Sequence, residues 1–446
     1  METNIAWIKK DLRLEDNDVL AQAIAHATKT GGTCIPVYVQ DPRDHSKTAQ
    51  GWDRTGTHRK AFEHACITAF AQQLQRAGSQ LLILKGKAEM VLPELAKQLG
   101  ATHLFHSQEA AAWERNRTAR TAQRLLGNPT PCRSKVCRAN TMLEPIDITQ
   151  VGMVFTPFSR KLEAANPRGP YKPLGIANFK SIQELPPQLV KQAEDSVKAW
   201  IEKEKGLTLA ANTDPRSSLY QILVPGEEGA NAHFQKYLAR GASEYHFKRN
   251  GLAGVDYSSK LSPWLALGCI SARKVGKAIR EAKFKLNLNW KSADKLTSEL
   301  IWRDFFWHIA LRFGANIFRH KGIDTKSARK PVRDPKKLER WITGTTPDPL
   351  VNAFMIELAT TGYMSNRGRQ IVASYLVNEL NQPWEDGAWW FQSQLIDFDP
   401  TQNWGNWLHA SGNGTDPVPD RKFNPRMQAE KFDPRGTFQK RWSSNP

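Results

Sequence analysis

Two aspartates and three tryptophans occur within one short stretch near the carboxyl end of the chain. The segment WFQSQLIDFDPTQNWGNW spans residues 390–407 and contains Asp397 and Asp399, which alternate with apolar residues. Burying a carboxylate is costly unless it meets a hydrogen-bond donor or a cation, so both aspartates require partners. No third acid or histidine stands close to them in the sequence, and we therefore expect no metal here.

The segment LTSELIWRDFFWHIALRF, residues 296–313, has the period of a helix. At about 100° per residue, one stripe collects an acid, a base and two aromatic rings, from Glu299, Trp302, Arg303 and Phe306. A stripe facing a core is normally aliphatic, and a solvent-exposed stripe normally lacks large aromatic rings. The pattern therefore indicates a cavity wall, or else an amphipathic helix whose arginine extends over a buried tryptophan.

A second helical segment, MSNRGRQIVASYLVNEL, places Asn366, Arg369 and Gln370 on one face. Two amides and a guanidinium can each hydrogen-bond a planar heterocycle. Taken alone, this helix is explained better by a solvated polar face. Arg369 is nevertheless the candidate partner for one of the two carboxylates, because a guanidinium pairs well with a carboxylate.

A third segment, DYSSKLSPWLALGCIS, places Ser258, Ser259, Lys260 and Ser262 just before an apolar helical run. Hydroxyl groups at this position can cap the helix. They can also bind phosphate together with the backbone N–H groups and the positive end of the helix dipole. The lysine within the cluster favours an anion.

The elements that must position these residues divide the chain into parts. From Ile5 to about Gly127, the strand-like runs IAWI, TCIPVYV, QLLILKG and THLFHS alternate with segments of helical period. This alternation predicts a parallel sheet covered on both faces, a doubly wound domain over residues 1–130. Neither G-x-G-x-x-G nor G-x-x-x-x-G-K occurs there, so the domain carries no nucleotide motif of its own.

The remainder of the chain lacks strand patterns. Residues 131–217 contain stretches rich in proline and glycine, such as NPRGPYKPLG and ELPPQ, and we expect an interdomain linker there. From Tyr220 onward amphipathic helices predominate, which predicts a helical domain over residues 218–446. Two domains agree with a length of 446 residues.

The charge of the chain indicates a polyanionic partner. Lysine and arginine number 63 against 44 acids, a formal charge of +19. Phosphate contacts release counterions and so favour binding by a basic protein, although the charge can also serve solubility. Fifteen tryptophans and nineteen phenylalanines favour nucleic acid, since bases stack on aromatic rings.

Nothing in the sequence suggests a membrane. No run of about 18 apolar residues occurs, and METNIAWIKKDLRL lacks the features of a secretory leader. We expect a cytosolic or nuclear protein, and of these two compartments we assign the cytoplasm. We also expect it to act as a monomer. The five cysteines are sparse and match no metal-binding spacing, which indicates reduced thiols without a shared role.

Taken together, the long motifs are similar to those of one family. The chain resembles the photolyase/cryptochrome family over nearly its whole length, and most closely its DASH branch. The resemblance rests on WIKKDLRLEDN, FTPFSRKLE, YHFKRNGLAGVDYSSKLSPWLALG, ELIWRDFFWH, TGYMSNRGRQIVASYL and QLIDFDPTQNWGNW, in the order of the family. It implies an FAD in the helical domain.

The resemblance also implies where the phosphate side of FAD would bind. By their positions in the motifs, the residues that would hold its phosphates and ribose are Tyr245, Ser258, Ser259, Lys260, Leu261 and Ser262. Arg303 would reach the diphosphate.

On the flavin side, Arg369 and Asp397 would form a pair beside the isoalloxazine. Asp399 would accept a hydrogen bond from the flavin or the ribose, and Asn403 would face flavin N5. Trp407 and Trp384 would be the first two members, counted from the flavin, of an electron-transfer chain to it. The third position of this family's tryptophan chain falls near Pro331, with Trp341 and Trp389 as candidate substitutes.

The implied reaction is light-driven repair of cyclobutane pyrimidine dimers, preferentially in single-stranded DNA, by electron transfer from excited reduced FAD. Glu299 and Asn366 would contact the dimer, and Trp302 would pack against it. A dimer must leave the base stack, and that cost is lowest in single strands. The alternatives are a blue-light photoreceptor that binds flavin and nucleic acid without efficient repair, and a basic nucleic-acid-binding protein without a cofactor.

The chain departs from the DASH pattern at several positions. His409 stands where a tyrosine is usual, and FTPFSRKLE is closer to photolyases in general. An antenna chromophore such as methenyltetrahydrofolate is typical of the family, and Glu109 and Glu114 lie in the region where it would bind.

Overall fold

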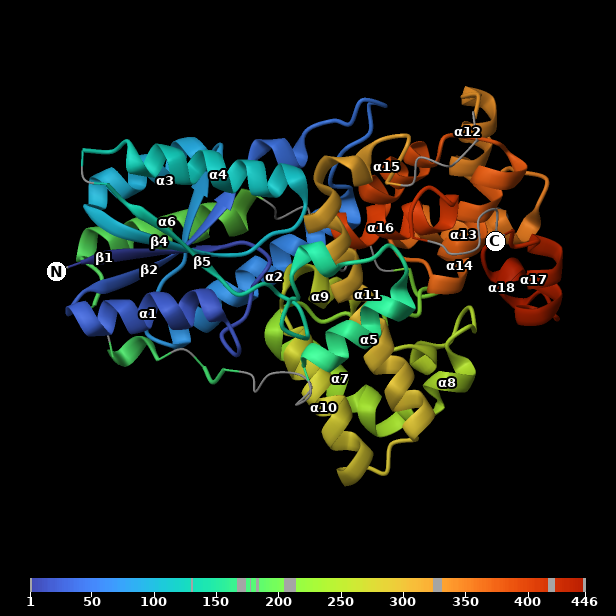
Figure 1. Ribbon diagram of the computed structural model, residues 1–446, viewed down its shortest axis with the longest axis horizontal. Coiled ribbons are helices and arrows are strands. Elements are labelled where there is room, and N and C mark those ends of the chain that lie inside the picture. The colour runs from blue at the N-terminus through green and yellow to red at the C-terminus, as the bar shows by residue number, and fades with distance from the viewer. Residues whose placement is uncertain are drawn as a thin grey trace.

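The structure is a computed structural model that describes residues 2–129, 131–166, 174–176, 178–181, 184–203, 214–323, 331–415 and 422–443. A sheet domain occupies one end of the molecule and a helical domain the other (Figure 1). The amino terminus lies at the outer end of the sheet domain, and the carboxyl terminus lies in the helical domain.

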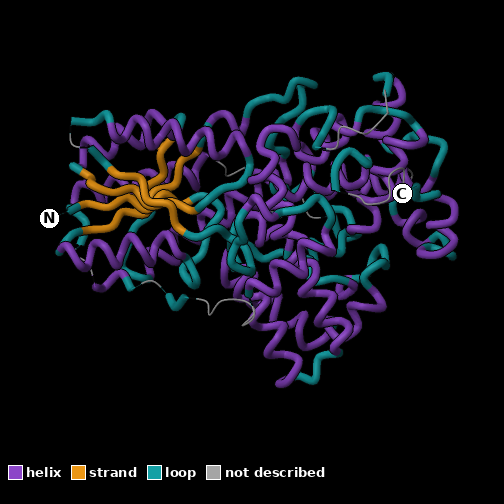
Figure 2. The backbone as a smooth tube through the Cα atoms, in the orientation of Figure 1, coloured by secondary structure: helices purple, strands orange, loops and turns teal. Residues whose placement is uncertain are grey.

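The first domain contains a parallel five-stranded sheet (Figure 2). Its strands are β1 (Thr3–Ile8), β2 (Thr33–Gln40), β3 (Leu82–Lys85), β4 (Ala101–Ser107) and β5 (Arg133–Cys137). They run in the order β3-β2-β1-β4-β5, and every pairing is parallel. The predicted doubly wound parallel sheet is therefore confirmed.

Helices cover both faces of the sheet. Ile5, Trp7 and Val37 belong to a core shared with α3 (Ala88–Leu99) and α4 (Ala112–Leu126). Ala6, Ile8 and Cys34 belong to the core that includes α1 (Asp18–Thr30) and α2 (Thr57–Arg76). Alternate strand residues point to opposite faces, so a sheet covered on both sides needs apolar residues at nearly every position.

Two elements of the sheet domain lie within the range predicted to be linker. β5 pairs with β4, and α6 (Pro187–Lys203) packs against the sheet through Leu189 and Ala193. Ser196 Oγ of α6 accepts a hydrogen bond from the backbone N–H of Ile83 on β3, at 3.0 Å. β5 has the sequence RSKVC and is largely exposed, so its composition gave no strand signal. The range 131–217 thus contributes a strand and a helix to the first domain.

The second domain is helical: no strand occurs between residues 214 and 443 where the structure describes the chain. Its longer helices are α7 (Gly226–Arg240), α10 (Ala272–Lys285), α11 (Trp290–Phe313), α12 (Pro335–Thr343), α13 (Pro349–Thr361), α14 (Asn366–Ser374), α15 (Trp384–Gln394), α16 (Pro400–Ser411) and α17 (Pro425–Phe432). The short helices are α8 (Tyr245–Lys248), α9 (Ser262–Leu267) and α18 (Thr437–Arg441), and α5 (Phe155–Ala165) packs against α11. None of the helices described here is long and apolar enough to cross a membrane.

Buried charges join the two domains. Arg273 of α10 pairs with Asp16 of the sheet domain at 2.8 Å, and both side chains are almost fully buried. Glu227 of α7 accepts the backbone N–H of Leu14 at 2.7 Å. Gly268 has φ +70°, and a Cβ there would lie 1.9 Å from the carbonyl oxygen of Lys10. Only glycine allows these two backbone segments to approach so closely.

Candidate functional site

A cavity of about 560 Å³ lies in the helical domain. Its lining comes mainly from α11, α14, α16 and the loop before α9, and its volume is within the usual range for small-molecule sites. All predicted site residues except Trp384 line it, namely Tyr245, Ser258, Ser259, Lys260, Leu261, Ser262, Glu299, Trp302, Arg303, Asn366, Arg369, Asp397, Asp399, Asn403 and Trp407.

A buried ion pair stands at one wall of the cavity. Arg369 Nη2 of α14 donates to Asp397 Oδ2 at 2.7 Å, and Arg369 Nε donates to the carbonyl oxygen of Met364 at 3.0 Å. The Asp397 side chain is 1% exposed, and its Oδ1 has no hydrogen-bond partner among the described residues. A buried carboxylate oxygen without a donor is unfavourable. A cofactor that presents an N–H or O–H group to this wall would satisfy it.

Asp399 has a structural role that the sequence analysis did not consider. Its Oδ1 accepts the backbone N–H groups of Thr401 at 2.9 Å and Gln402 at 3.1 Å, so it caps α16. Its Oδ2 lies 3.8 Å from Lys10 Nζ of the sheet domain. Burial opposes ionisation, but Lys10 and Arg303 hold the pKa of Asp399 below its ordinary value. An aspartate followed by Pro400 at the first helical position was the available signal for this cap.

Two further polar residues make specific contacts at this wall. Asn403 Nδ2 donates to the carbonyl oxygen of Ala388 at 3.0 Å, which fixes its side chain. Arg303 Nη1 donates to the carbonyl oxygen of Asn140 in the segment that follows β5. Both residues therefore have defined orientations at the cavity.

The serine–lysine loop does not cap the helix that follows it. The residue before α9 is Leu261, and no side chain caps the helix. Lys260 has φ +47°, and its ammonium donates to the carbonyl oxygens of Gly254 at 2.7 Å and Val255 at 2.9 Å. Burial lowers the pKa of Lys260 to about 8. The lysine therefore braces its own loop with two of its three donors, and the neighbouring hydroxyl groups line the cavity.

The mouth of the cavity combines charged and aromatic groups. Glu299 lies 3.1 Å from Lys295 Nζ and 3.8 Å from Arg249 Nη1, and its side chain is 37% exposed. The rings of Trp302 and His409 are 5.5 Å apart in an edge-to-face arrangement. His409 therefore stands beside Trp302.

Phe155 is a neighbour of the mouth that the sequence analysis quoted without a role. It is the first residue of α5, and its ring stacks on Trp302 with centroids 3.8 Å apart and planes within 3°. One face of Trp302 is therefore covered by a residue that lies about 150 positions earlier in the sequence. Sequence periodicity gives no information about such a contact.

The tryptophans proposed to carry electrons, together with Trp404, pack in two groups. Trp407 lines the cavity, and its ring lies 6.3 Å from Trp341, which is fully buried. Trp384 is buried and is not among the residues that line the cavity, and its ring lies 5.7 Å from Trp404. Trp389 lies 4.9 Å from Trp404 and is partly exposed. Trp384 thus packs with Trp404 and Trp389, and Trp341 packs with Trp407.

A basic stripe on α11 was also missed. Helical spacing of about 100° per residue places Lys291 and Lys295 on the same face as Trp302. Lys291 Nζ lies 5.5 Å from the ring of Trp290, which is 64% exposed. The stripe leads from the first turn of the helix to the cavity mouth, because Lys295 and Trp302 both line the cavity. The sequence signal for this stripe was the segment NWKSADK, whose two lysines share the helical register of the predicted stripe.

The two acids expected near an antenna chromophore are already engaged. Glu109 lies 2.6 Å from Lys9 Nζ, and Glu114 lies 2.6 Å from Lys10 Nζ. Burial is the main cause that raises the pKa of Glu114, to about 7. These carboxylates bind lysines of the strand end that faces the helical domain.

The fold and the cavity define a two-domain protein with a sheet domain and a helical domain that encloses a small-molecule cavity. Residues 4–174 match the family model described as DNA photolyase, and residues 296–445 match the model described as the FAD binding domain of DNA photolyase. The chain belongs to the photolyase/cryptochrome family.

Individual relatives cover almost the whole chain. Cryptochrome DASH of Synechocystis sp. is 34% identical, over 99% of this chain and 87% of the relative. The crystal structure of the Synechocystis sp. PCC6803 cryptochrome superposes with a TM-score of 0.86 at 33% identity, over 99% of this chain and 88% of the other. A bacterial class III photolyase from Agrobacterium tumefaciens superposes with a TM-score of 0.81 at 28% identity, over 99% of this chain and 86% of the other. The predicted relation to the DASH branch is confirmed.

Proposed function

We propose that the protein repairs cyclobutane pyrimidine dimers in single-stranded DNA under blue or near-ultraviolet light. The observation that carries the proposal is the arrangement of one cavity. Its inner wall has the Arg369–Asp397 pair, and its mouth has Glu299, Trp302 and Asn366. Reduced FAD bound in this cavity supplies the light-excited electron donor for the dimer.

The residues of the cavity fit such a cofactor. The unpartnered Oδ1 of Asp397 offers an acceptor to an N–H group of the flavin, and the neighbouring guanidinium of Arg369 offsets the negative charge. Ser258, Ser259 and Ser262 present hydroxyl groups to the cavity, where they would bind phosphate or ribose. Arg303 adds a positive charge for the diphosphate.

The residues at the mouth suit an extruded dimer. Trp302 and His409 would pack against the flipped bases, since bases stack on aromatic rings. Glu299 and the amide of Asn366 would hydrogen-bond the edges of the dimer. Lys291 and Lys295 would contact the phosphates of the strand that leads to the mouth, which supports DNA as the partner.

An antenna chromophore remains part of the proposal without a defined site. Glu109 and Glu114 are occupied by Lys9 and Lys10, so a chromophore there would bind against an existing network of ion pairs. We therefore propose that an antenna, if bound, uses other groups at this edge.

The test is repair of oligonucleotides that contain one dimer, in single-stranded and double-stranded form. The purified flavin-loaded protein is incubated with each under blue light and in the dark, and restored thymines are quantified. We expect light-dependent repair that is faster on the single strand. No repair on either substrate in the light, with dimer binding intact, would reject the proposal.

One contact favours the second candidate, a blue-light photoreceptor that binds flavin and nucleic acid without efficient repair. Phe155 covers one face of Trp302, which is the ring expected to pack against the lesion. Phe155→Ala would free that face. A photoreceptor would show DNA binding but little repair in the native chain, and repair that rises in this variant. Efficient repair by the native chain that does not rise in the variant would instead support the repair enzyme.

A further inference from the structure

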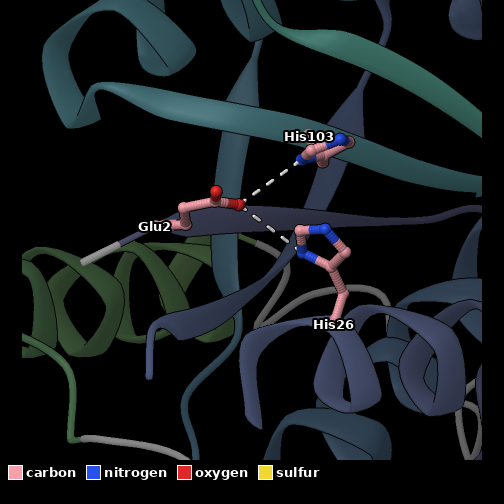
Figure 3. A group of neighbouring side chains, drawn as sticks. All are labelled: Glu2, His26 and His103. Carbon is pink, nitrogen blue, oxygen red and sulfur yellow. Dashed lines mark ion pairs between the residues drawn. The ribbon is translucent and has the colours of Figure 1, made fainter. Parts of the chain in front are cut away.

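A carboxylate and two imidazoles converge at the amino end of the sheet, at the opposite side of that domain from the cavity (Figures 1 and 3). Glu2 immediately precedes β1, His26 lies on α1, and His103 lies on β4. Glu2 Oε2 is 3.8 Å from Nδ1 of each histidine. The three ligand atoms lie within 4.8 Å of one another, and within the described ranges no other group of three such side chains does so.

The backbone of Glu2 is held in place although it lies near the chain terminus. Its carbonyl oxygen accepts the backbone N–H of Thr33 at 3.0 Å. Gly32 packs directly on it, since a Cβ at that position would lie 2.0 Å from the Glu2 carbonyl oxygen. The carboxylate is also held, because Thr102 Oγ1 donates to Glu2 Oε2 at 3.1 Å.

A register irregularity brings His103 to the same place. Thr3 of β1 pairs with Ala101 of β4, but Asn4 pairs with His103, so β4 holds one extra residue, Thr102. Such an irregularity re-aims side chains relative to a regular strand. Thr102 Oγ1 lies 3.1 Å from His103 Nδ1 as well as from the carboxylate, so both neighbouring residues reach the cluster.

The cluster is incompletely satisfied by the protein itself. Nδ1 of His26 is buried and has no hydrogen-bond partner among the described residues. The distance of 3.8 Å to Glu2 is too long for a hydrogen bond. The centroids of the two imidazole rings lie only 4.3 Å apart. A neutral imidazole is the form that binds a metal ion, and a buried unpaired ring nitrogen calls for a further ligand.

We propose that Glu2, His26 and His103 bind a Zn²⁺ ion. Two imidazoles and one carboxylate are a known donor set for zinc, with bond lengths of about 2.0–2.2 Å. In a tetrahedral site, ligand atoms are therefore about 3.3 Å apart. Each Glu2–histidine separation would have to close by about half an ångström, which side-chain rotation supplies.

The site has an open coordination position. Three protein ligands leave a fourth place for water, and the carboxylate of Glu2 is 41% exposed, so solvent can reach the ion. The hydroxyl group of Thr102 would serve as an outer partner that orients the carboxylate. Because the ligands come from the start of β1, from α1 and from β4, the bound ion would link three elements of the sheet domain.

The test uses the full-length flavin-loaded protein with any affinity tag removed and with metal stripped by a chelator. Zn²⁺ is titrated calorimetrically, and the thermal midpoint is measured with and without Zn²⁺. We expect one ion per chain and a higher midpoint in its presence, because a ligand that binds only the folded state stabilises it. His26→Ala and His103→Ala should each weaken binding at least tenfold and abolish the thermal shift.

Two variants make the result specific. Glu2→Gln changes an exposed carboxylate without removing side-chain volume, and it should weaken Zn²⁺ binding while flavin content stays unchanged. His45→Ala removes a histidine of the same domain outside the cluster and should bind Zn²⁺ as the native chain does. All five cysteines are buried and do not compete. Undiminished binding in the His26, His103 and Glu2 variants, or no binding in the native chain, would overturn the proposal.

Discussion

At the scale of single residues, Glu299 is the side chain whose removal should separate repair from cofactor binding. It lies at the mouth of the cavity, where it pairs with Lys295 and Arg249. Loss of one hydrogen bond to a bound ligand costs about 1–3 kcal/mol. We expect Glu299→Ala to retain flavin and to bind dimer-containing single strands about tenfold or more weakly.

The measurement is dimer affinity and repair yield per absorbed photon, with flavin absorbance as the check on folding. Asp147→Ala, which removes an exposed acid that does not line the cavity, is the control. Native affinity and native yield in Glu299→Ala would remove this residue from the lesion site.

Glu357 should make the stability of the protein depend on pH. This residue of α13 is fully buried, and burial raises its pKa from 4.5 to about 8. Between these two values the folded state binds a proton that the unfolded state has lost, so the free energy of unfolding falls as pH rises. Each unit of pKa difference corresponds to about 1.4 kcal/mol.

Urea unfolding between pH 5 and pH 7.5 tests this expectation. Glu357→Gln removes the titrating group at constant volume, so its free energy of unfolding should decline less with pH than that of the native chain. The window stays below pH 8 because Lys260, whose lowered pKa is also about 8, has the opposite effect above it. Parallel curves for the two proteins would show that Glu357 does not titrate in this window.

At the scale of elements, the arrangement of α15 and α16 indicates where electrons enter. Pro331 stands where the family's third tryptophan is expected, and proline cannot carry an electron hole. Trp384, Trp404 and Trp389 lie ring to ring, and Trp389 is partly exposed, whereas Trp341 is fully buried. Trp404 and Trp407 are three positions apart on α16 and therefore neighbours.

We therefore expect Trp389 to replace the missing third tryptophan. Trp389→Phe should slow photoreduction of oxidised flavin under blue light with an external reductant, and Trp341→Phe should leave it nearly unchanged. Flavin absorbance measures both. Fast photoreduction that persists in Trp389→Phe but fails in Trp341→Phe would instead assign the role to the buried ring.

The basic stripe of α11 gives a second prediction at this scale. Lys291→Gln combined with Lys295→Gln should weaken binding of undamaged single strands and lower its dependence on salt, because fewer counterions are released. Lys277→Gln combined with Lys285→Gln removes the same charge from α10 and should change binding less. Filter binding at several salt concentrations measures the slope. Equal slopes in the two double variants would place the strand elsewhere.

Local periodicity explains what the sequence could predict at the element scale. The stripe of Glu299, Trp302 and Arg303 follows from the turn of one helix, and all three residues line the cavity. The stacking of Phe155 on Trp302 and the contacts of Lys260 with its own loop depend on tertiary placement, which no periodicity encodes. β5 escaped prediction because a short exposed edge strand needs neither apolar nor alternating residues.

At the scale of the whole molecule, the charge of +19 should appear in the salt dependence of DNA binding. For single strands, the logarithm of the binding constant should fall linearly with the logarithm of salt concentration, with a slope of about −0.7 per phosphate contact. Fluorescence anisotropy of a labelled undamaged oligonucleotide measures this slope. A flat dependence would show that the charge serves solubility alone.

The interface between the two domains limits how the protein can be divided into separate parts. Asp16 and Arg273 are buried against each other, and Glu227 accepts N–H groups from the sheet domain. Either domain expressed alone would therefore expose charged groups that lack their partners. Gly268 and the backbone of Lys10 leave no room for a side chain between them. The two domains are therefore not interchangeable modules: a chimaera with a relative would have to carry both sides of the interface together.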